Sequence, residues 1–365
     1  MRNFSLIILL CALFACMSEQ KEHMEYRRVL KFGSELAPLI PQHIKQIDFL
    51  PLEFSEAARF YNIDKLVFKN DLIYIGDFHS RKIVVYDMSG RVAFVLDKLG
   101  RGFGEYLELK SFAVDSNNIY TIDNFTGMAN IYDCRTGEFR TSKKLPVVAW
   151  DIETLGNGDF ILAFIPVAPG KLYKSQPNYR IFITDNDFVI KRCLFKFDED
   201  YSEPIGQPVF FTQSGDSIVF SSFQFDGFTV FDRNDAEQFY HVAIDFDHKI
   251  PEKHRWDKDI ISNSRYSYLI STPVLCKDYV SIDICVGDYL ENYVYDAGTG
   301  TFIGNPETDR KNYLIPPLCS FNGKFVSLLP GHMYAELIEK GFPRPASDIN
   351  RRLREGDSAL LFYTL

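Results

Sequence analysis

The sequence predicts an all-β fold built from a repeated unit of four short strands, and two observations support this. The first is a dipeptide of an aromatic residue or threonine followed by aspartate, which ends successive apolar segments: Tyr86-Asp87, Tyr132-Asp133, Thr184-Asp185, Phe231-Asp232 and Tyr295-Asp296. Successive copies lie roughly 46 to 64 residues apart, near the length of one blade of a β-propeller. The second is the aromatic content, 33 Phe and 20 Tyr in 365 residues, which favours pleated sheet.

Alternating apolar segments bounded by Gly, Asn and Asp fill these intervals with strands. Five complete units are predicted at 63–97, 110–145, 148–197, 208–246 and 268–303. A sixth unit has only three strands, within 313–321, 324–329 and 358–363, and residues 44–52 provide an unassigned apolar strand. Pairing this N-terminal strand with the last one would remove an exposed edge. We therefore expect a six-bladed β-propeller over residues 44–365, closed by an N-terminal strand that completes the last blade; seven blades is the weaker alternative.

The N-terminus has the pattern of a secretory leader that ends in a lipidated cysteine. Arg2 precedes an apolar run that is too short to span a bilayer. Leu13-Phe14-Ala15-Cys16 then resembles the bacterial lipobox, which implies a signal peptide over 1–15 and acylation of Cys16. The alternative is an ordinary secretory signal with an incidental cysteine. Residues 16–43 are polar and are expected to form a tether without strands, so deleting 17–40 should leave the fold intact. The expected location is the cell envelope, on a face of the outer membrane.

Charge and cysteine content restrict the classes of partner and site. The net charge is −9, and no run of Lys and Arg exceeds three residues, so the pattern of a nucleic-acid-binding protein is absent. Five cysteines follow Cys16, and none has metal-ligand spacing. Buried free thiols are the favoured interpretation, and pairing in an oxidising envelope is the alternative.

Three segments of the first two units resemble a known family of repeats. Leu72–Asp87 has the order strand, Asp, polar turn with Arg, strand and aromatic-Asp of an NHL-type repeat. Gly100–Tyr106 is similar to the glycine-rich linker between such blades, and Ile119–Asp123 restarts the unit. With the lipobox, the chain resembles the six-bladed propeller lipoproteins of Bacteroidetes. This resemblance implies a location and a shape rather than a reaction.

Loop lengths indicate which face of the predicted propeller binds a ligand. Every long connection follows the second or the fourth strand of a unit, which places all of them on one face, and long loops on one face of a repeat scaffold mark a binding surface. The last of them, 330–354, is expected to contain two short helices. Aromatic and charged residues of this face suit a glycan, a peptide or an envelope protein. The candidate ligand-binding residues are Phe103, Glu105, Tyr106, Arg81 and Trp256. The alternative is that such aromatics only pack the loops down.

A weaker pattern is compatible with catalysis. His79 with Asp77, and Asp123 in the next unit, could form an acid/base or metal cluster at the mouth of the channel. A divalent metal is then possible, although no cofactor or defined metal site is predicted. Asp at this position of a blade also caps the turn, which is the competing interpretation. The sequence thus favours a binding or scaffolding module, with a metal-assisted lyase or hydrolase as the alternative.

Overall fold

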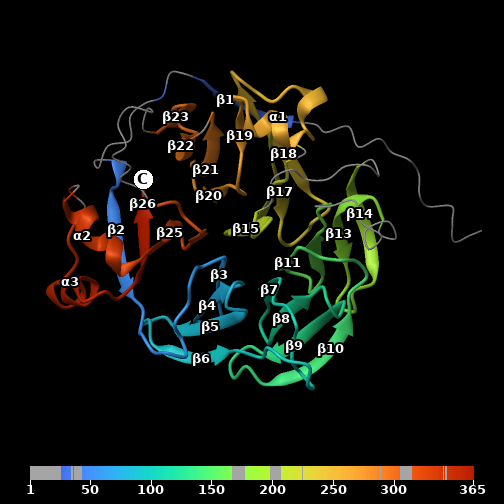
Figure 1. The fold of residues 1–365 in the computed structure, drawn as a ribbon, viewed down its shortest axis with the longest axis vertical. Coiled ribbons are helices and arrows are strands. Elements are labelled where there is room, and N and C mark those ends of the chain that lie inside the picture. Colours follow the sequence, from blue (N-terminus) through green and yellow to red (C-terminus); the bar gives the residue numbers. More distant parts are fainter. Residues whose placement is uncertain are drawn as a thin grey trace, which may run out of the picture.

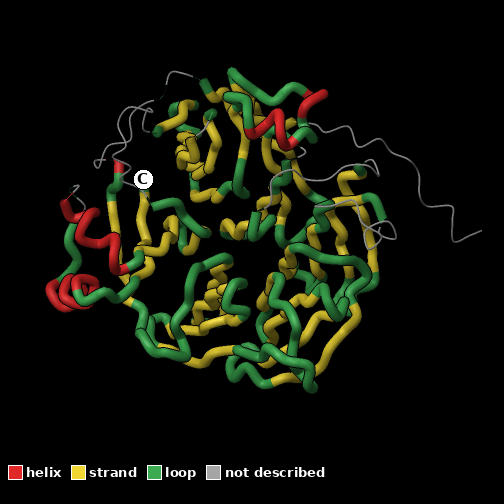
Figure 2. Tube along the Cα trace, viewed as in Figure 1, coloured by secondary structure: helices red, strands yellow, loops and turns green. Residues whose placement is uncertain are grey.

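The computed structural model describes residues 26–33, 36, 43–166, 177–197, 207–223, 225–287, 289–304, 315–339, 341 and 343–365. The fold is all-β and propeller-like, with sheets arranged around a central axis (Figure 1). Most of the chain outside strands is loop, and the helices lie at the periphery (Figure 2). The predicted signal peptide 1–15 and the predicted lipidation site Cys16 lie outside the described residues.

Three sheets each contain four consecutive strands in an antiparallel meander. The first contains β3 (Lys65–Lys69), β4 (Leu72–Asp77), β5 (Lys82–Asp87) and β6 (Val92–Leu96). The second contains β7 (Ser111–Val114), β8 (Asn118–Asp123), β9 (Met128–Asp133) and β10 (Phe139–Lys144). The third contains β11 (Asp151–Thr154), β12 (Phe160–Ala163), β13 (Tyr179–Thr184) and β14 (Ile190–Lys196).

A fourth sheet has a divided inner strand. β19 (Ser267–Leu269) and β20 (Val274–Cys276) both pair with β21 (Tyr279–Val286), followed by β22 (Tyr289–Asp296) and β23 (Thr301–Ile303). The sequence predicted one strand over 268–276. Pro273 lies at the break, where it has no N–H for a ladder hydrogen bond.

The remaining strands form one nine-stranded sheet that contains two meanders. The first is β15 (Phe211–Ser214), β16 (Ser217–Phe220), β17 (Gly227–Asp232) and β18 (Phe239–Phe246), with β1 (Tyr26–Phe32) outside it. The second is β24 (Cys319–Phe321), β25 (Lys324–Leu329), β26 (Ala359–Thr364) and β2 (Gln46–Pro51). A single parallel pairing, Ser214 with Ser320, joins them. Because of this pairing the described strands form five hydrogen-bonded sheets, whereas six were predicted.

The predicted pairing of the N-terminal strand with the last strand is confirmed. β2 is antiparallel to β26 in continuous register, from Gln46 opposite Thr364 to Pro51 opposite Ala359. The two predicted helices are also confirmed, as α2 (Gly331–Glu339) and α3 (Ser347–Arg354). Both lie outside β2 (Figure 1), and Arg352 Nη2 donates to the carbonyl of Leu52 at 3.0 Å. The helices thus lie beside the outermost strand of this meander, which limits its exposure as an edge.

The expectation that residues 16–43 lack strands is wrong for Tyr26–Phe32. This segment forms β1, which pairs in parallel with β18 over residues that include Leu30 opposite Ile244. In chain order, β15–β18 is the fourth meander and β19–β23 is the fifth. Leu30 and Phe32 are buried in the apolar core between these two meanders, so β1 contributes to packing. Deleting 17–40 would therefore remove a packed strand and not only a tether.

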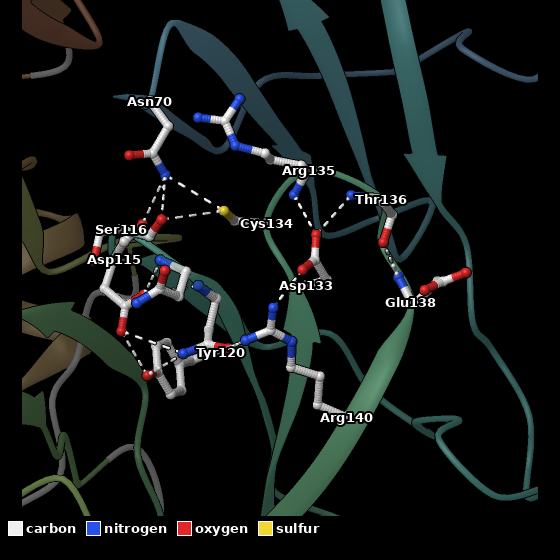
Figure 3. A network of polar contacts seen from close by, with 12 residues as sticks. Asn70, Asp115, Ser116, Tyr120, Asp133, Cys134, Arg135, Thr136, Glu138 and Arg140 are labelled. Carbon is white, nitrogen blue, oxygen red and sulfur yellow. Dashed lines mark hydrogen bonds and ion pairs between the residues drawn. The ribbon is translucent and has the colours of Figure 1, made fainter.

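The repeated aspartates cap the turns that follow the third strand of their meanders. Asp133 Oδ1 accepts the backbone N–H groups of Arg135 at 2.8 Å and Thr136 at 2.9 Å, and its other oxygen accepts from Arg140 (Figure 3). The same backbone capping occurs at Asp87, Asp185, Asp232 and Asp296. The repeat in the sequence is therefore a repeat of turn chemistry.

A buried ion cluster connects the inner strands of the first four meanders. The ammonium group of Lys65, in β3, lies 2.7 Å from Asp151 Oδ1 and 2.9 Å from Glu153 Oε1, both in β11. Ser111 Oγ of β7 donates to Asp151 at 2.5 Å, and Gln213 Nε2 of β15 donates to Glu153 at 2.6 Å. Although burial alone would lower the pKa of Lys65, the two carboxylates raise it above its ordinary value, so the Lys65 ammonium group stays charged.

The cysteines follow the favoured interpretation. Cys134, Cys193, Cys276, Cys285 and Cys319 all carry free thiols. Four are buried and Cys193 is half-buried. Burial raises the pKa of Cys276 to about 11, which keeps this thiol protonated near neutral pH.

β1 contains a matched pair of neighbouring residues that tests its contribution to stability. Leu30 is 1% exposed and Val29 is 53% exposed. Leu30→Ala should lower the free energy of unfolding by about 2–5 kcal/mol, whereas Val29→Ala should change it by less than about 0.5 kcal/mol. Urea denaturation of both variants measures this difference, and equal midpoints would show that β1 does not pack as described.

Candidate functional site

A pocket of about 290 Å³ lies between the first two meanders. Three connections line it: the β4–β5 turn with Phe78, His79 and Arg81, the end of the β6–β7 connection with residues 107–110, and the β8–β9 turn with Phe125. All three belong to the predicted long-loop face, because they follow second or fourth strands. The strand order confirms that the predicted long connections follow second or fourth strands of their meanders. Residues 167–176, 198–206 and 305–314 of three of these connections lie outside the described part of the chain.

Asp77 fixes the first of these turns. Its side chain is fully buried, and its oxygens accept the backbone N–H groups of Tyr61 at 2.6 Å and Ser80 at 2.8 Å. Burial alone would raise the pKa of Asp77, but the hydrogen bonds from Ser80 and Tyr61 lower it below its ordinary value. The carboxylate therefore stays ionised as a turn cap.

Asp123 has the same role in the second meander. It is also fully buried, and it accepts the backbone N–H groups of Leu107 at 2.8 Å and Phe125 at 2.9 Å. One carboxylate thus holds two of the connections that line the pocket. The two aspartates predicted as catalytic candidates support the pocket from below, and their oxygens are engaged by backbone amides.

Arg81 and His79 lie at the rim of the pocket. Both are exposed, and the ring of His79 is 5.5 Å from the ring of Tyr61, measured between centroids. Arg81 has a φ of 56°, in the left-handed region that non-glycine residues adopt rarely and that is frequent at functional sites. Its carbonyl accepts the hydroxyl of Tyr106 at 2.7 Å. The structure therefore holds the Arg81 backbone in this conformation from beneath.

Glu108 and Lys110 provide opposite charges in the pocket wall, and both are half-buried. Burial raises the pKa of Glu108 and lowers the pKa of Lys110, while each charge partly offsets the effect on the other. The Lys110 ammonium group also lies 3.9 Å from the centre of the Trp150 ring, a cation–π contact. Ionisable groups with shifted pKa values in a concave site mark it as a candidate for binding or catalysis.

The structure brings together some of the predicted ligand-binding residues and separates others. Arg81 lines the pocket with His79. Tyr106, predicted to contact ligand, is fully buried, and this part of the prediction is corrected: it supports the Arg81 turn. Glu105 is exposed, but its carboxylate accepts the N–H of Gly102 at 2.6 Å and closes its own loop.

The last two predicted residues lie away from the pocket lining. Phe103 is 94% exposed and contacts Phe139 of the outer strand β10 edge to face, with ring centroids 4.8 Å apart. Trp256 is half-buried in the β18–β19 connection, where the Arg180 guanidinium lies 5.9 Å from its ring centre. Neither residue lines the pocket between the first two meanders.

Glu108, Lys110 and Phe125 line the pocket but were not among the predicted site residues. A signal for the first two was present in the sequence, because the segment 107–110 directly precedes an inner strand, so it must lie at the mouth of the central channel. Phe125 follows the capping Asp123 by two residues, as His79 follows Asp77. The two turns are therefore equivalent positions of adjacent meanders.

The described part of the chain lacks two further features. No cluster of three or more His, Cys, Asp or Glu side chains is arranged to hold a metal ion in that part. No helix among the same residues is long and apolar enough to cross a membrane.

Comparison with known proteins identifies the family. A family model described as "Domain of unknown function (DUF4934)" matches residues 39–356. The chain belongs to the DUF4934 family. No curated protein sequence matches this DUF4934 chain.

Two solved structures from Bacteroides resemble this DUF4934 chain. One is a protein of Bacteroides fragilis NCTC 9343 assigned as exported, with 16% identity and a TM-score of 0.75, covering 92% of this chain and 99% of that one. The other is a member of the DUF4221 family from Bacteroides vulgatus ATCC 8482, with 12% identity and a TM-score of 0.50, covering 88% and 96%. At these identities the similarity shows the fold alone.

The coupling between Glu108 and Lys110 can be measured directly. In Lys110→Met the pKa of Glu108 should rise further, because the nearby positive charge that favours the carboxylate is lost. A ¹³C NMR titration of the glutamate side chains measures this shift. Lys98→Met, an exposed residue of the same connection, is the control and should leave the Glu108 titration unchanged. An unshifted Glu108 in Lys110→Met would mean that the two groups do not interact.

Proposed function

We propose that this DUF4934 protein is a binding module of the cell envelope that captures a carboxylate-bearing ligand at the pocket between its first two meanders. The proposal rests on the combination, in one pocket, of three cationic or ionisable nitrogen groups with the exposed ring of Phe125. His79, Arg81 and Lys110 supply the nitrogen groups, and Glu108 is the opposing carboxylate.

The chemistry of the pocket favours an acidic glycan as the first ligand class to test. Phe125 is 77% exposed, so a flat apolar surface is available to stack against the C–H face of a sugar, and the half-buried Phe78 lines the same pocket. The Arg81 guanidinium can bind a carboxylate through two parallel hydrogen bonds. An acidic peptide or a segment of a partner protein presents the same carboxylate and is the second class.

Binding is favoured over the lyase or hydrolase hypothesis because of what the predicted catalytic groups contact. Asp77 and Asp123 are both buried beneath the turns and accept backbone amides, so neither supports His79 as a base. The engagement of both aspartates by backbone amides therefore supports a proposal of binding rather than catalysis.

We further propose that the protein is a six-bladed, NHL-like propeller anchored through lipid on Cys16. Dividing the nine-stranded sheet at its single β15–β24 pairing yields six meanders, which supports the count. β1 is parallel to β18, so Tyr26 lies near the short-turn end of β18, beside His241. The chain from Cys16 would therefore enter on the side opposite to the pocket, and the pocket would be accessible from the envelope space or the exterior.

Capture of acidic oligosaccharides tests the proposal. Arg81→Gln and Lys110→Gln should each weaken binding roughly tenfold or more, since each removes a charge-assisted contact worth about 1.5–3 kcal/mol. Isothermal titration calorimetry with acidic and matched neutral oligosaccharides, and with acidic peptides, measures this. Arg135→Gln, an exposed arginine of a short turn on the opposite face, is the control.

The same measurement at several pH values has a defined sign. Affinity should fall as pH rises through the lowered pKa of Lys110, because a cation is lost. It should rise as pH falls through the raised pKa of Glu108, because a repulsive carboxylate is neutralised. Binding that is equal for acidic and neutral ligands, and for Arg81→Gln and Arg135→Gln, would contradict the proposed site.

A further inference from the structure

A second pocket of about 350 Å³ lies between the fourth and fifth meanders, at the short-turn end of the molecule. Its wall is formed by β17 and β18 on one side and by β20, β21 and the start of the β22–β23 turn on the other. β1 supplies Arg27, Arg28 and Leu30 to the same wall. The pocket is therefore complete only when the N-terminal strand is docked.

The interior of this pocket is apolar. Leu30, Phe228 and Val242 are buried residues that belong to the core between the two meanders, and Tyr295 faces them from β22. The pocket thus opens at the end of an apolar core, where a ring or short acyl group would lose water-exposed surface on entering. Its volume is at the lower end of the range for small-molecule sites.

The rim of the pocket is mainly cationic. Arg27, Arg28 and Lys277 are exposed there, with Asp278 as the one carboxylate in the lining. The guanidinium of Arg27 lies 4.8 Å from the centre of the Tyr240 ring, which holds it over the wall formed by β18. Lys277 is in the β20–β21 turn with a φ of 56°, and the end of its side chain lies against Gly323 of the β24–β25 turn. An apolar interior with this rim is complementary to an amphipathic anion.

We propose that this pocket binds a small amphipathic anion, with its apolar part against Leu30 and Phe228 and its anionic group at Arg28. The inference is independent of the site between the first two meanders. Because β1 provides three of the lining residues, a ligand that needs the complete pocket stabilises docking of β1 according to its concentration relative to Kd. Ligand binding and the docking of β1 against β18 are then coupled.

The amphipathic anion could be a soluble metabolite or a membrane lipid, and the experiment distinguishes these two kinds of ligand. The soluble probe is 2-naphthalenesulfonate, with 2-naphthol as the uncharged analogue, both measured by isothermal titration calorimetry. The lipid arm measures flotation of the protein with vesicles of phosphatidylglycerol in phosphatidylcholine, against vesicles of phosphatidylcholine alone. We expect the sulfonate to bind at least tenfold more tightly than the naphthol. Flotation that requires phosphatidylglycerol and is lost in Arg28→Gln would indicate that the natural ligand is a lipid.

Arg28→Gln should weaken sulfonate binding roughly tenfold, and the Arg28 side chain is exposed, so the folded protein should be retained. Lys31→Gln is the matched control, because Lys31 is an exposed cation of β1 that does not line the pocket. Saturating sulfonate should also slow hydrogen exchange of the β1 amides in wild type. Equal affinities for Arg28→Gln and Lys31→Gln, or tight sulfonate binding with unchanged exchange in β1, would overturn the proposal.

Discussion

The ammonium group of Lys65 is the point on which the first four meanders converge. Two carboxylates of β11 contact it, Ser111 of β7 and Gln213 of β15 bind those carboxylates, and the backbone N–H groups of Phe210 and Phe211 donate to Asp151 at 2.8 and 2.9 Å. A buried ion cluster is costly to desolvate and is retained only when its members are satisfied. This cluster therefore restricts how the inner strands can be arranged relative to one another.

The candidate binding site depends on this arrangement. Asp64, Lys110 and Trp150 each precede a residue of the cluster, namely Lys65, Ser111 and Asp151. The cluster thus sets the position of Lys110 against Trp150 at the mouth of the channel. The capping aspartates then fix the turns that carry His79, Arg81 and Phe125 above it. Rigid inner strands, capped turns and a pocket between adjacent meanders form one continuous structure, as preorganised binding requires.

Local patterns in the sequence predicted the repeated features well. Strand alternation and the aromatic-Asp dipeptides predicted the meanders and their turns, and the apolar strand at 44–52 predicted the pairing with residues 358–363. β1 was missed because Tyr26–Phe32 contains three cations and only two buried apolar side chains, Leu30 and Phe32. The two apolar side chains are buried by residues of neighbouring meanders, and the sequence of the segment alone does not show these contacts.

The lining of the candidate pocket was less visible in the sequence than the fold, and for a similar reason. Residue type marked Tyr106 as a ligand contact, but its hydroxyl is used internally by the carbonyl of Arg81, a pairing between residues 25 positions apart. Glu108 and Lys110 carry no recognisable motif. They line the pocket because the end of the β6–β7 connection lies at the mouth of the channel, and this position depends on the order of the strands.

The most direct test of this account is the effect of Lys65→Met on stability and on native-state hydrogen exchange. Leaving Asp151 and Glu153 buried without their cation should lower the free energy of unfolding by about 3–5 kcal/mol. Exchange should then increase together in β3, β7 and β11, and adding Asp151→Asn and Glu153→Gln should recover part of the lost stability. Wild-type stability in Lys65→Met, or increased exchange confined to β3, would contradict the claim that this cluster holds the inner strands together.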